Sequence, residues 1–253
     1  MGTEIFSLTD KVAIITGASK GIGAAIAHGF ARAGARVVVS SRKQDAVDAV
    51  AREIEAAGGT ALGVAAHMGE PAQIQKLVDT AVAILGGVDI LVNNAAINPT
   101  FGLVIDADLG VFQKMVDVNI KGYLLAIQHC APHMRRRGGG SIINLASTAG
   151  LQPAIGLGLY SITKAAVIML TRVLAKELGP EKIRVNAIAP GVIKTKFSQT
   201  LWNTPEIYER TVSSAALRRI GMPAELIGTA LYLASDASSF TTGETIVVDG
   251  GVN

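Results

Sequence analysis

A short run of apolar and β-branched residues leads into a glycine-rich segment, which in turn opens an alanine-rich helical pattern. The run is Val12–Thr16, the glycine-rich segment is Thr16–Gly23, and the helical pattern continues to Ala33. Glycines between a strand and a helix allow a tight turn, close backbone approach to a phosphate, and close packing of the helix on the strand. The first helical turn then offers free N–H groups and the positive end of its dipole to an anion. This order of elements predicts a dinucleotide-binding βα unit.

Strand and helix patterns continue to alternate along the chain, and most strand candidates are continuously apolar, as expected for strands buried on both faces. We therefore expect an α/β fold, a single Rossmann-type domain over residues 1–253 with a doubly wound parallel sheet of seven strands and helices on both faces. The dinucleotide-binding half should span residues 10–150, and the catalytic and substrate-lid part residues 151–253. The expected strands are Val12–Thr16, Arg36–Ser40, Thr60–Ala66, Ile90–Val92, Ser141–Ala146, Arg184–Ala189 and Thr245–Val248, and the expected helices include Gly21–Ala33, Ala46–Ala57 and Pro71–Leu85.

Composition narrows the classes of partner. The net charge is +3, which is too small a surplus to indicate nucleic-acid binding, and no apolar stretch is long and uninterrupted enough to predict a membrane span. Cys130 is the single cysteine, so no intrachain disulfide can form, and no signal peptide is visible. We therefore expect a cytoplasmic protein with no nucleic-acid or membrane partner. His129 and His133 flank Pro132 and are typical of a helix end, so no metal site is expected.

Three motifs of other enzyme classes are partly matched by the sequence, two in the glycine-rich segment and one at Ser161–Lys164. Gly17-x-Ser19-x-Gly21 matches a hydrolase nucleophile elbow, but that motif needs a late histidine, and no histidine follows His133. A P-loop would end in Gly-Lys-Ser or Gly-Lys-Thr, and this loop does not. Ser161-x-x-Lys164 matches an acylating motif, but its Ser-Asp-Asn and Lys-Thr-Gly partners are missing.

The second expected strand ends Val39-Ser40-Ser41-Arg42-Lys43, where an NAD-binding protein usually places an acid for the ribose hydroxyls. A carboxylate there would repel a 2′-phosphate, whereas a guanidinium can grip it. Lys20 could add a second cation. These residues favour NADP(H) as cofactor, over the alternative that Arg42 and Lys43 only begin a solvated helix.

Tyr160 and Lys164 are four residues apart in a helical pattern, so their side chains should lie on one face. A free phenol has a pKa of about 10, and a neighbouring ammonium group favours the phenolate. The pair therefore predicts an acid/base for interconversion of a carbonyl and an alcohol.

Together these motifs resemble the short-chain dehydrogenase/reductase family over essentially the whole chain. The further matching elements are Asn93-Asn94-Ala95-Ala96, Asn119, Ser147 (thirteen residues before Tyr160) and Pro190–Thr195. A closer resemblance, to a branch of NADPH-dependent carbonyl and retinol reductases, rests on Val38–Gln44, Ala96–Pro99 and Ile193–Ser198.

The resemblance implies a catalytic role for four residues. Tyr160 would be the general acid in reduction and the base in oxidation, and Lys164 would lower its pKa and hold the nicotinamide ribose. Ser147 would bind the substrate oxygen, and Asn119 would hold a water that links Lys164 to solvent. The implied cofactor site comprises Gly17, Ser19, Lys20, Gly21, Ile22, Gly23, Ser41, Arg42, Lys43, His67, Met68, Asn94, Ala95, Ala96, Tyr160, Lys164, Pro190, Gly191, Ile193 and Thr195.

Two positions depart from the family pattern. Ala96 replaces the usual glycine, which narrows the space beside the cofactor. His67-Met68 replaces the aspartate that commonly binds adenine, which leaves the Met68 backbone N–H as the candidate contact.

The expected substrate is a largely apolar ketone or aldehyde beneath a mobile lid formed by residues 192–220. Trp202, the sole tryptophan, is expected to contact the substrate; the alternative is that it packs into the core.

The alternative function for the whole chain is a non-catalytic, NADP-binding, redox-sensing regulator. We also expect a homotetramer, because two long helices carry more apolar surface than one sheet face can cover. The predicted substrate contacts are Ile97, Leu151, Pro153, Ile155, Phe197, Leu201 and Trp202.

Overall fold

The computed structural model describes residues 3–252; Met1, Gly2 and Asn253, which the expected domain includes, lie outside the described residues. Seven parallel strands form one sheet in the order β3-β2-β1-β4-β5-β6-β7. The predicted single Rossmann-type domain is confirmed. The strands are β1 (Val12–Thr16), β2 (Arg36–Ser41), β3 (Thr60–Ala65), β4 (Ile90–Asn93), β5 (Gly140–Leu145), β6 (Ile183–Pro190) and β7 (Thr245–Val248).

The sheet reverses its winding at β1. The chain first moves outward through β2 to β3, then returns to place β4 on the other side of β1, with Ile14 paired to Val38 and to Leu91. All five residues of β1 are buried, as its central place in the sheet requires. A crevice forms beyond the carboxyl ends of strands where the winding reverses, so β1 and β4 define the expected place for a ligand.

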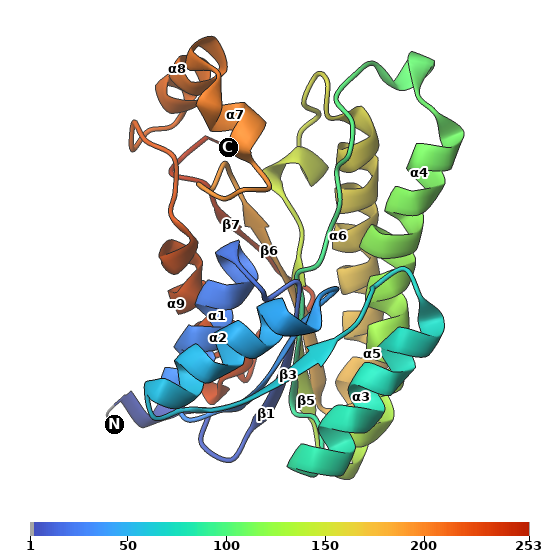
Figure 1. Ribbon diagram of the computed structural model, residues 1–253, viewed down its shortest axis with the longest axis vertical. Helices are drawn as coiled ribbons and strands as arrows, with labels where there is room; N and C mark the ends of the chain where they lie inside the picture. Colours follow the sequence, from blue (N-terminus) through green and yellow to red (C-terminus); the bar gives the residue numbers. More distant parts are fainter. Residues whose placement is uncertain (1–2, 253) are drawn as a thin grey trace.

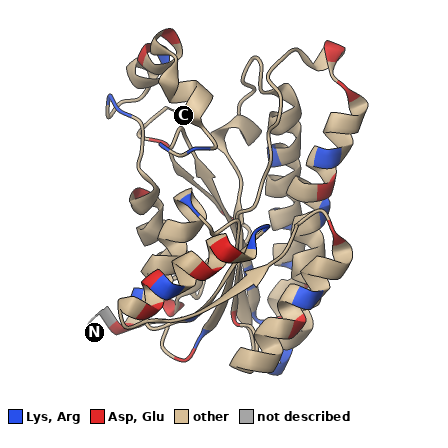
Figure 2. Cartoon of the chain, in the orientation of Figure 1, with Lys and Arg blue, Asp and Glu red and all other residues tan. Residues whose placement is uncertain are grey.

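Helices cover both faces of the sheet (Figure 1). One apolar core joins the sheet to α1 (Gly21–Arg32), α2 (Gln44–Ala56) and α9 (Ile227–Ala234). The other joins it to α3 (Pro71–Leu85), α5 (Gly122–Arg136) and α6 (Gly158–Leu178). Figure 2 shows acidic and basic residues interleaved along α2 and α3. The remaining helical elements are α4 (Leu109–Val116), α7 (Gln199–Asn203), α8 (Pro205–Ser214), a π-helical turn η3 (Asp117–Lys121), and the 3-10 turns η1 (Thr3–Phe6), η2 (Val104–Asp106), η4 (Thr148–Gly150), η5 (Gly179–Glu181), η6 (Pro223–Leu226) and η7 (Asp236–Ser238).

One described segment, Gly158–Glu181, has the length and apolar composition of a membrane span. Its residues Val167, Leu174 and Leu178 are buried, and the helix packs against β6 and η4. These contacts are those of a core helix in an α/β domain.

The end of α5 is tied to the base of the sheet. Arg137 donates from Nε to Asp89 at 2.6 Å, and the second carboxylate oxygen of Asp89 accepts from the backbone N–H of Val12 at 2.8 Å. The sequence Arg135-Arg136-Arg137, followed by three glycines, by itself predicts a solvated helix end. The structure corrects this for Arg137, because its partner Asp89 is buried and arrives from a distant part of the chain.

Candidate active site

A cavity of about 500 Å³ opens at the carboxyl ends of the central strands. It collects the glycine loop, the end of β2, the Asn93–Ala96 segment, the β5 end and the loop after β6. Of the predicted cofactor residues, all but Gly23 and Lys43 line it: Gly17, Ser19, Lys20, Gly21, Ile22, Ser41, Arg42, His67, Met68, Asn94, Ala95, Ala96, Tyr160, Lys164, Pro190, Gly191, Ile193 and Thr195.

The glycine loop lies against the segment that follows β4. Gly17 has φ +66, and a Cβ placed there would lie 2.8 Å from the Cα of Ala95. A Cβ at Gly23 would lie 2.6 Å from both Nδ2 of Asn94 and the carbonyl oxygen of Gly17. Side chains are therefore excluded on steric grounds, and Gly23 serves by helix–loop packing although it does not border the cavity.

Asn94 holds this loop with its side chain. Its Nδ2 donates to the carbonyl oxygens of Thr16 at 2.8 Å and Gly17 at 3.1 Å, and its backbone N–H donates to Thr16 Oγ1 at 3.0 Å. The Asn94 amide group is thus engaged within the protein, so its contribution to a ligand site is to fix the shape of the glycine loop.

One corner of the cavity carries two hydroxyls and two cations. Ser19 donates to Ser41 at 3.0 Å, which brings the glycine loop to the end of β2. Lys20 and Arg42 line the same part of the cavity, and neither has an ion-pair partner within residues 3–252. Lys43 instead lies outside the cavity at the N-cap of α2.

His67 and Met68, from the loop after β3, also line the cavity. The His67 backbone N–H donates to Gln73 Oε1 at 2.9 Å, and its Nδ1 accepts from the Gly69 N–H at 3.0 Å. Met68 is almost fully buried. The loop after β3 therefore has a defined shape without the usual aspartate.

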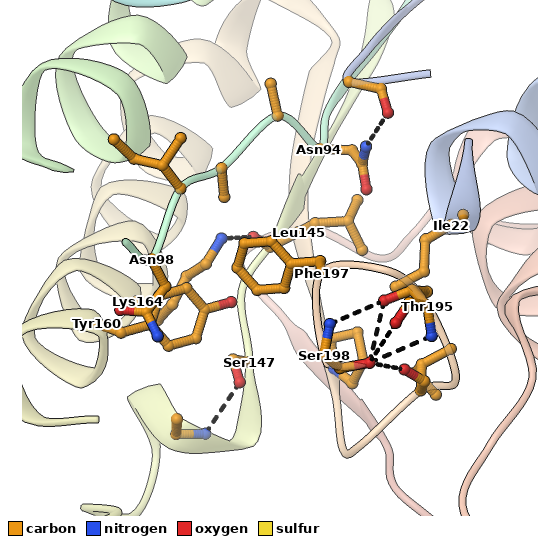
Figure 3. Close-up of a pocket in the computed structure, with 18 of the residues that line it drawn as sticks. Ile22, Asn94, Asn98, Leu145, Ser147, Tyr160, Lys164, Thr195, Phe197 and Ser198 are labelled. Atoms are coloured by element: carbon orange, nitrogen blue, oxygen red, sulfur yellow. Dashed lines mark hydrogen bonds between the residues drawn. The ribbon is translucent and has the colours of Figure 1, made fainter. Parts of the chain in front are cut away.

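Three of the four predicted catalytic residues, Ser147, Tyr160 and Lys164, line the cavity together (Figure 3), whereas Asn119 does not border it. Tyr160 and Lys164 come from the first turns of α6, and Ser147 follows β5. Lys164 is buried, and its Nζ donates to the carbonyl oxygen of Leu145 at 2.5 Å and lies 5.6 Å from the centre of the Tyr160 ring. Ser147 accepts from the Ala149 N–H at 3.2 Å, which orients its hydroxyl.

Burial is the main cause of the pKa shifts of Tyr160 and Lys164. The protein packed around the Tyr160 hydroxyl raises its pKa above the ordinary value of 10.0, while its hydrogen bond with Ser147 acts in the opposite direction. Burial also lowers the pKa of Lys164 to about 7. Burial and the Ser147 hydroxyl account for the pKa shift of Tyr160 in the free protein, and the expectation that Lys164 lowers this pKa stays a prediction.

Asn119 lies in the π-helical turn between α4 and α5 and is fully buried. Its Oδ1 accepts from the Ile97 N–H at 2.9 Å, and its Nδ2 donates to the Ile97 carbonyl at 2.9 Å and to Thr163 Oγ1 at 3.2 Å. The side chain thus joins the loop after β4 to α6. π-helical turns occur often at functional sites, and this one places Asn119 beside α6.

Ser198 organises the loop after β6, a role that sequence reasoning missed. Its hydroxyl donates to the carbonyl oxygen of Ile193 and accepts from the Thr195 N–H at 3.2 Å (Figure 3). The Lys194 backbone N–H donates to the Gly221 carbonyl at 2.8 Å, which fixes the loop at a second point. A serine three residues after Thr195 was the available signal, since such a hydroxyl commonly bonds to nearby backbone.

A family model described as enoyl-(acyl carrier protein) reductase matches residues 17–253. The chain is 44% identical over 244 residues to dehydrogenase/reductase SDR family member 4 of Oryctolagus cuniculus, covering 96% of this chain and 94% of that protein. The chain belongs to the short-chain dehydrogenase/reductase family. It is accordingly an oxidoreductase of the class that acts on CH–OH and carbonyl groups.

Two solved short-chain dehydrogenase/reductase structures show the same architecture. A gluconate 5-dehydrogenase from Burkholderia cenocepacia in complex with NADP and tartrate has a TM-score of 0.95 at 33% identity, covering 98% of this chain and 97% of that one. A 7α-hydroxysteroid dehydrogenase complexed with NADH and 7-oxo glycochenodeoxycholic acid has a TM-score of 0.95 at 37% identity, covering 99% and 97%. The first of these structures thus contains NADP, and the second contains NADH.

The residues of this short-chain dehydrogenase/reductase fit such a dinucleotide. The loop at Gly17 and Gly23 has no room for a Cβ, and the first turn of α1 has no side-chain cap, which leaves its N–H groups for a pyrophosphate. Ala96 needs no left-handed backbone, because among the described non-glycine residues only Asp10, Lys182 and Arg218 have positive φ. The departure from glycine at this position is therefore compatible with the fold.

The substrate end of the cavity differs in part from the prediction. Ile97, Pro153, Phe197 and Leu201 line it, whereas Leu151, Ile155 and Trp202 do not. Leu151 and Ile155 are instead exposed, with Ile155 95% exposed. Trp202 turns toward its own loop, where Nε1 donates to the Thr195 carbonyl at 3.1 Å and Lys194 Nζ lies 5.4 Å from the ring. The cavity is also lined by residues that were not predicted from the sequence, among them Phe101, Gln152, Leu157 and Val252.

Proposed function

We propose that this protein is an NADP(H)-dependent carbonyl reductase and alcohol dehydrogenase in which Tyr160 exchanges the proton. The observation that carries the proposal is the corner formed by Ser19, Ser41 and Arg42, which has hydroxyl and guanidinium donors and no acid where a 2′-phosphate would bind. It lies in the same cavity as Tyr160 and Lys164.

Each catalytic residue has a separable task. A nicotinamide cofactor bound in this cavity supplies or accepts the hydride. Ser147 donates to the substrate oxygen, and Tyr160 gives that oxygen a proton in reduction or takes it in oxidation. Lys164 holds the ribose and, as an ammonium, stabilises the Tyr160 phenolate. Asn119 keeps α6 in register with the loop that carries Ile97.

The cavity walls favour a bulky apolar ketone or aldehyde. Ile97, Phe101, Leu157, Phe197 and Leu201 line the cavity that Tyr160 also borders. One relative is complexed with a 7-oxo steroid acid, and another is named for gluconate, so the family takes substrates of very different polarity. The preponderance of apolar walls is what favours the apolar class here.

The test is oxidation of NADPH, with NADH in parallel, against ketones, diketones, quinones, aldehydes, small keto acids and an enoyl thioester. We expect turnover of apolar carbonyls with a preference for NADPH. A preference for NADH would contradict the cofactor proposal, and selective turnover of keto acids or of the enoyl thioester would contradict the substrate class. Tight binding of NADPH without turnover of any of these substrates would favour a redox-sensing regulator.

A further inference from the structure

The ammonium group of Lys164 lies between two phenol rings. Its Nζ is 5.6 Å from the centre of the Tyr160 ring and 5.3 Å from the centre of the Tyr123 ring. Tyr160 is on the same helix and borders the cavity, whereas Tyr123 comes from α5 and is fully buried. No carboxylate between residues 3 and 252 forms an ion pair with Lys164, so its neighbours are dipoles and ring faces.

The hydroxyl of Tyr123 has one orientation that satisfies all its contacts. It donates to the carbonyl oxygen of Leu145 at 3.3 Å, and it accepts from Lys164 Nζ at 3.4 Å. Lys164 Nζ donates to the same Leu145 carbonyl at 2.5 Å. Because the single phenolic proton points toward the carbonyl, the lone pairs of the Tyr123 oxygen face the ammonium group.

This phenol cannot itself exchange protons with a substrate. Burial raises the pKa of Tyr123 well above 10.0, and Tyr123 is absent from the lining of the cavity. Its hydroxyl therefore remains a neutral acceptor toward Lys164 whenever the protein is folded.

We propose that Tyr123 is a positioning residue, whose hydroxyl oxygen holds the Lys164 ammonium group from the core side and directs it along the floor of the cavity. The functional consequence rests on the proposed function, since Lys164 acts there by holding the ribose and stabilising the Tyr160 phenolate. The contact itself exists in the free protein and can be tested without a cofactor.

The groups that face Lys164 set the direction of the expected effect. They are Tyr123 from α5, the Leu145 carbonyl from β5 and Tyr160 from α6. A hydrogen bond to the charged form of a group favours that form. Removing the Tyr123 hydroxyl while keeping its ring should therefore make Lys164 lose its proton at lower pH.

The variant is Tyr123→Phe, and the matched control is Tyr232→Phe. Tyr232 is part-buried and bonds to Thr241 Oγ1 at 2.8 Å, so the control removes the same atom from a different hydrogen bond. The readout is the pH titration of the ¹³Cε resonance of Lys164 in the cofactor-free protein, assigned by its loss in Lys164→Met. We expect the midpoint to fall by about half to one pH unit in Tyr123→Phe, and to stay unchanged in Tyr232→Phe.

In active enzyme, the alkaline limb of the kcat/KM profile should move to lower pH by the same amount. An unchanged Lys164 midpoint in folded Tyr123→Phe would overturn the inference, whatever the turnover. If Tyr123→Phe does not fold, Tyr123→Met removes the hydroxyl with a flexible apolar side chain and is judged by the same midpoint. Absence of NADPH turnover in the unaltered protein would refute the proposed function alone, because the titration needs no cofactor.

Discussion

The ring of Phe197 lies 5.9 Å from the ring of Tyr160, centre to centre, with the two planes tilted by 48°. Phe197 belongs to the loop after β6, and Tyr160 to the start of α6, so the two meet only across the cavity (Figure 3). This contact places an apolar cover beside the proposed proton donor and links the loop to the chemistry.

Replacing Phe197 should therefore impair substrate capture more than cofactor binding. For Phe197→Ala we expect kcat/KM for apolar ketones to fall at least about tenfold, because an apolar wall beside the reacting carbon is lost. The control is Trp202→Phe, which keeps an aromatic ring on the same loop outside the cavity. Steady-state kinetics with calorimetric NADPH titration would check this, and an equal loss in the control would contradict it.

Tyr160→Phe should retain the fold and cofactor affinity but lose the transferable proton. We expect kcat to fall at least about a hundredfold, the low end for general acid–base catalysis. The matched control is Tyr208→Phe, since Tyr208 is exposed on α8. Single-turnover rates would report the step directly, and near-normal rates for Tyr160→Phe would remove Tyr160 from the mechanism.

Arg42→Ala should raise the KM for NADPH far more than that for NADH, because the guanidinium faces the proposed 2′-phosphate site. Lys43→Ala removes a neighbouring cation that does not line the cavity and should leave the ratio of the two KM values almost unchanged. Ser41→Asp should shift preference toward NADH by charge repulsion. Equal changes of the KM ratio in Arg42→Ala and Lys43→Ala would show that the preference depends only on overall surface charge.

Lys164 should lower the stability of the free protein at neutral and acidic pH. Its pKa is about 7 in the folded protein against 10.5 ordinarily, so between these values the unfolded chain binds a proton that the folded protein releases. The free energy of unfolding attributable to Lys164 therefore rises with pH across that window, and the cost of burying the charge is complete below it.

Lys164→Met should accordingly stabilise the protein more at low pH. We expect the gain at about pH 6 to exceed the gain at about pH 9 by about 2 kcal/mol. Urea unfolding at both pH values measures this, with Lys176→Met as control because Lys176 is exposed on the same helix. A gain independent of pH would show that Lys164 is not desolvated in solution.

The outer side of α6 carries exposed apolar residues, including Ile162, Met169 and Val173. We expect them to be covered in a homotetramer, so Met169→Lys should dissociate the assembly in light scattering. Ile84→Lys, at an exposed apolar site on α3, is the control and should leave the assembly intact. A particle of 26.1 kDa for the unaltered protein would contradict the tetramer.

The order of elements and the ends of the strands could be predicted from the sequence because they depend on local patterns. Continuous apolar runs, the glycines of Thr16–Gly23 and the spacing of Tyr160 and Lys164 are all read within a few residues. Most of the predicted cofactor residues follow strand ends, and parallel strands bring their carboxyl ends to one edge. Their convergence on one cavity was therefore predictable from the sequence.

Contacts between distant segments were decided only by the tertiary structure. Trp202 and Ile155 are apolar residues predicted as substrate contacts, yet neither lines the cavity: Trp202 Nε1 donates to the Thr195 carbonyl, and Ile155 is exposed. The pKa of Lys164 depends on the number of protein atoms around it, which helical spacing cannot give. Tyr123 meets Lys164 because two helices pack on the same strand, and no local pattern encodes that distance. Sequence patterns determine which chemistry is available, whereas side-chain direction and desolvation depend on long-range packing.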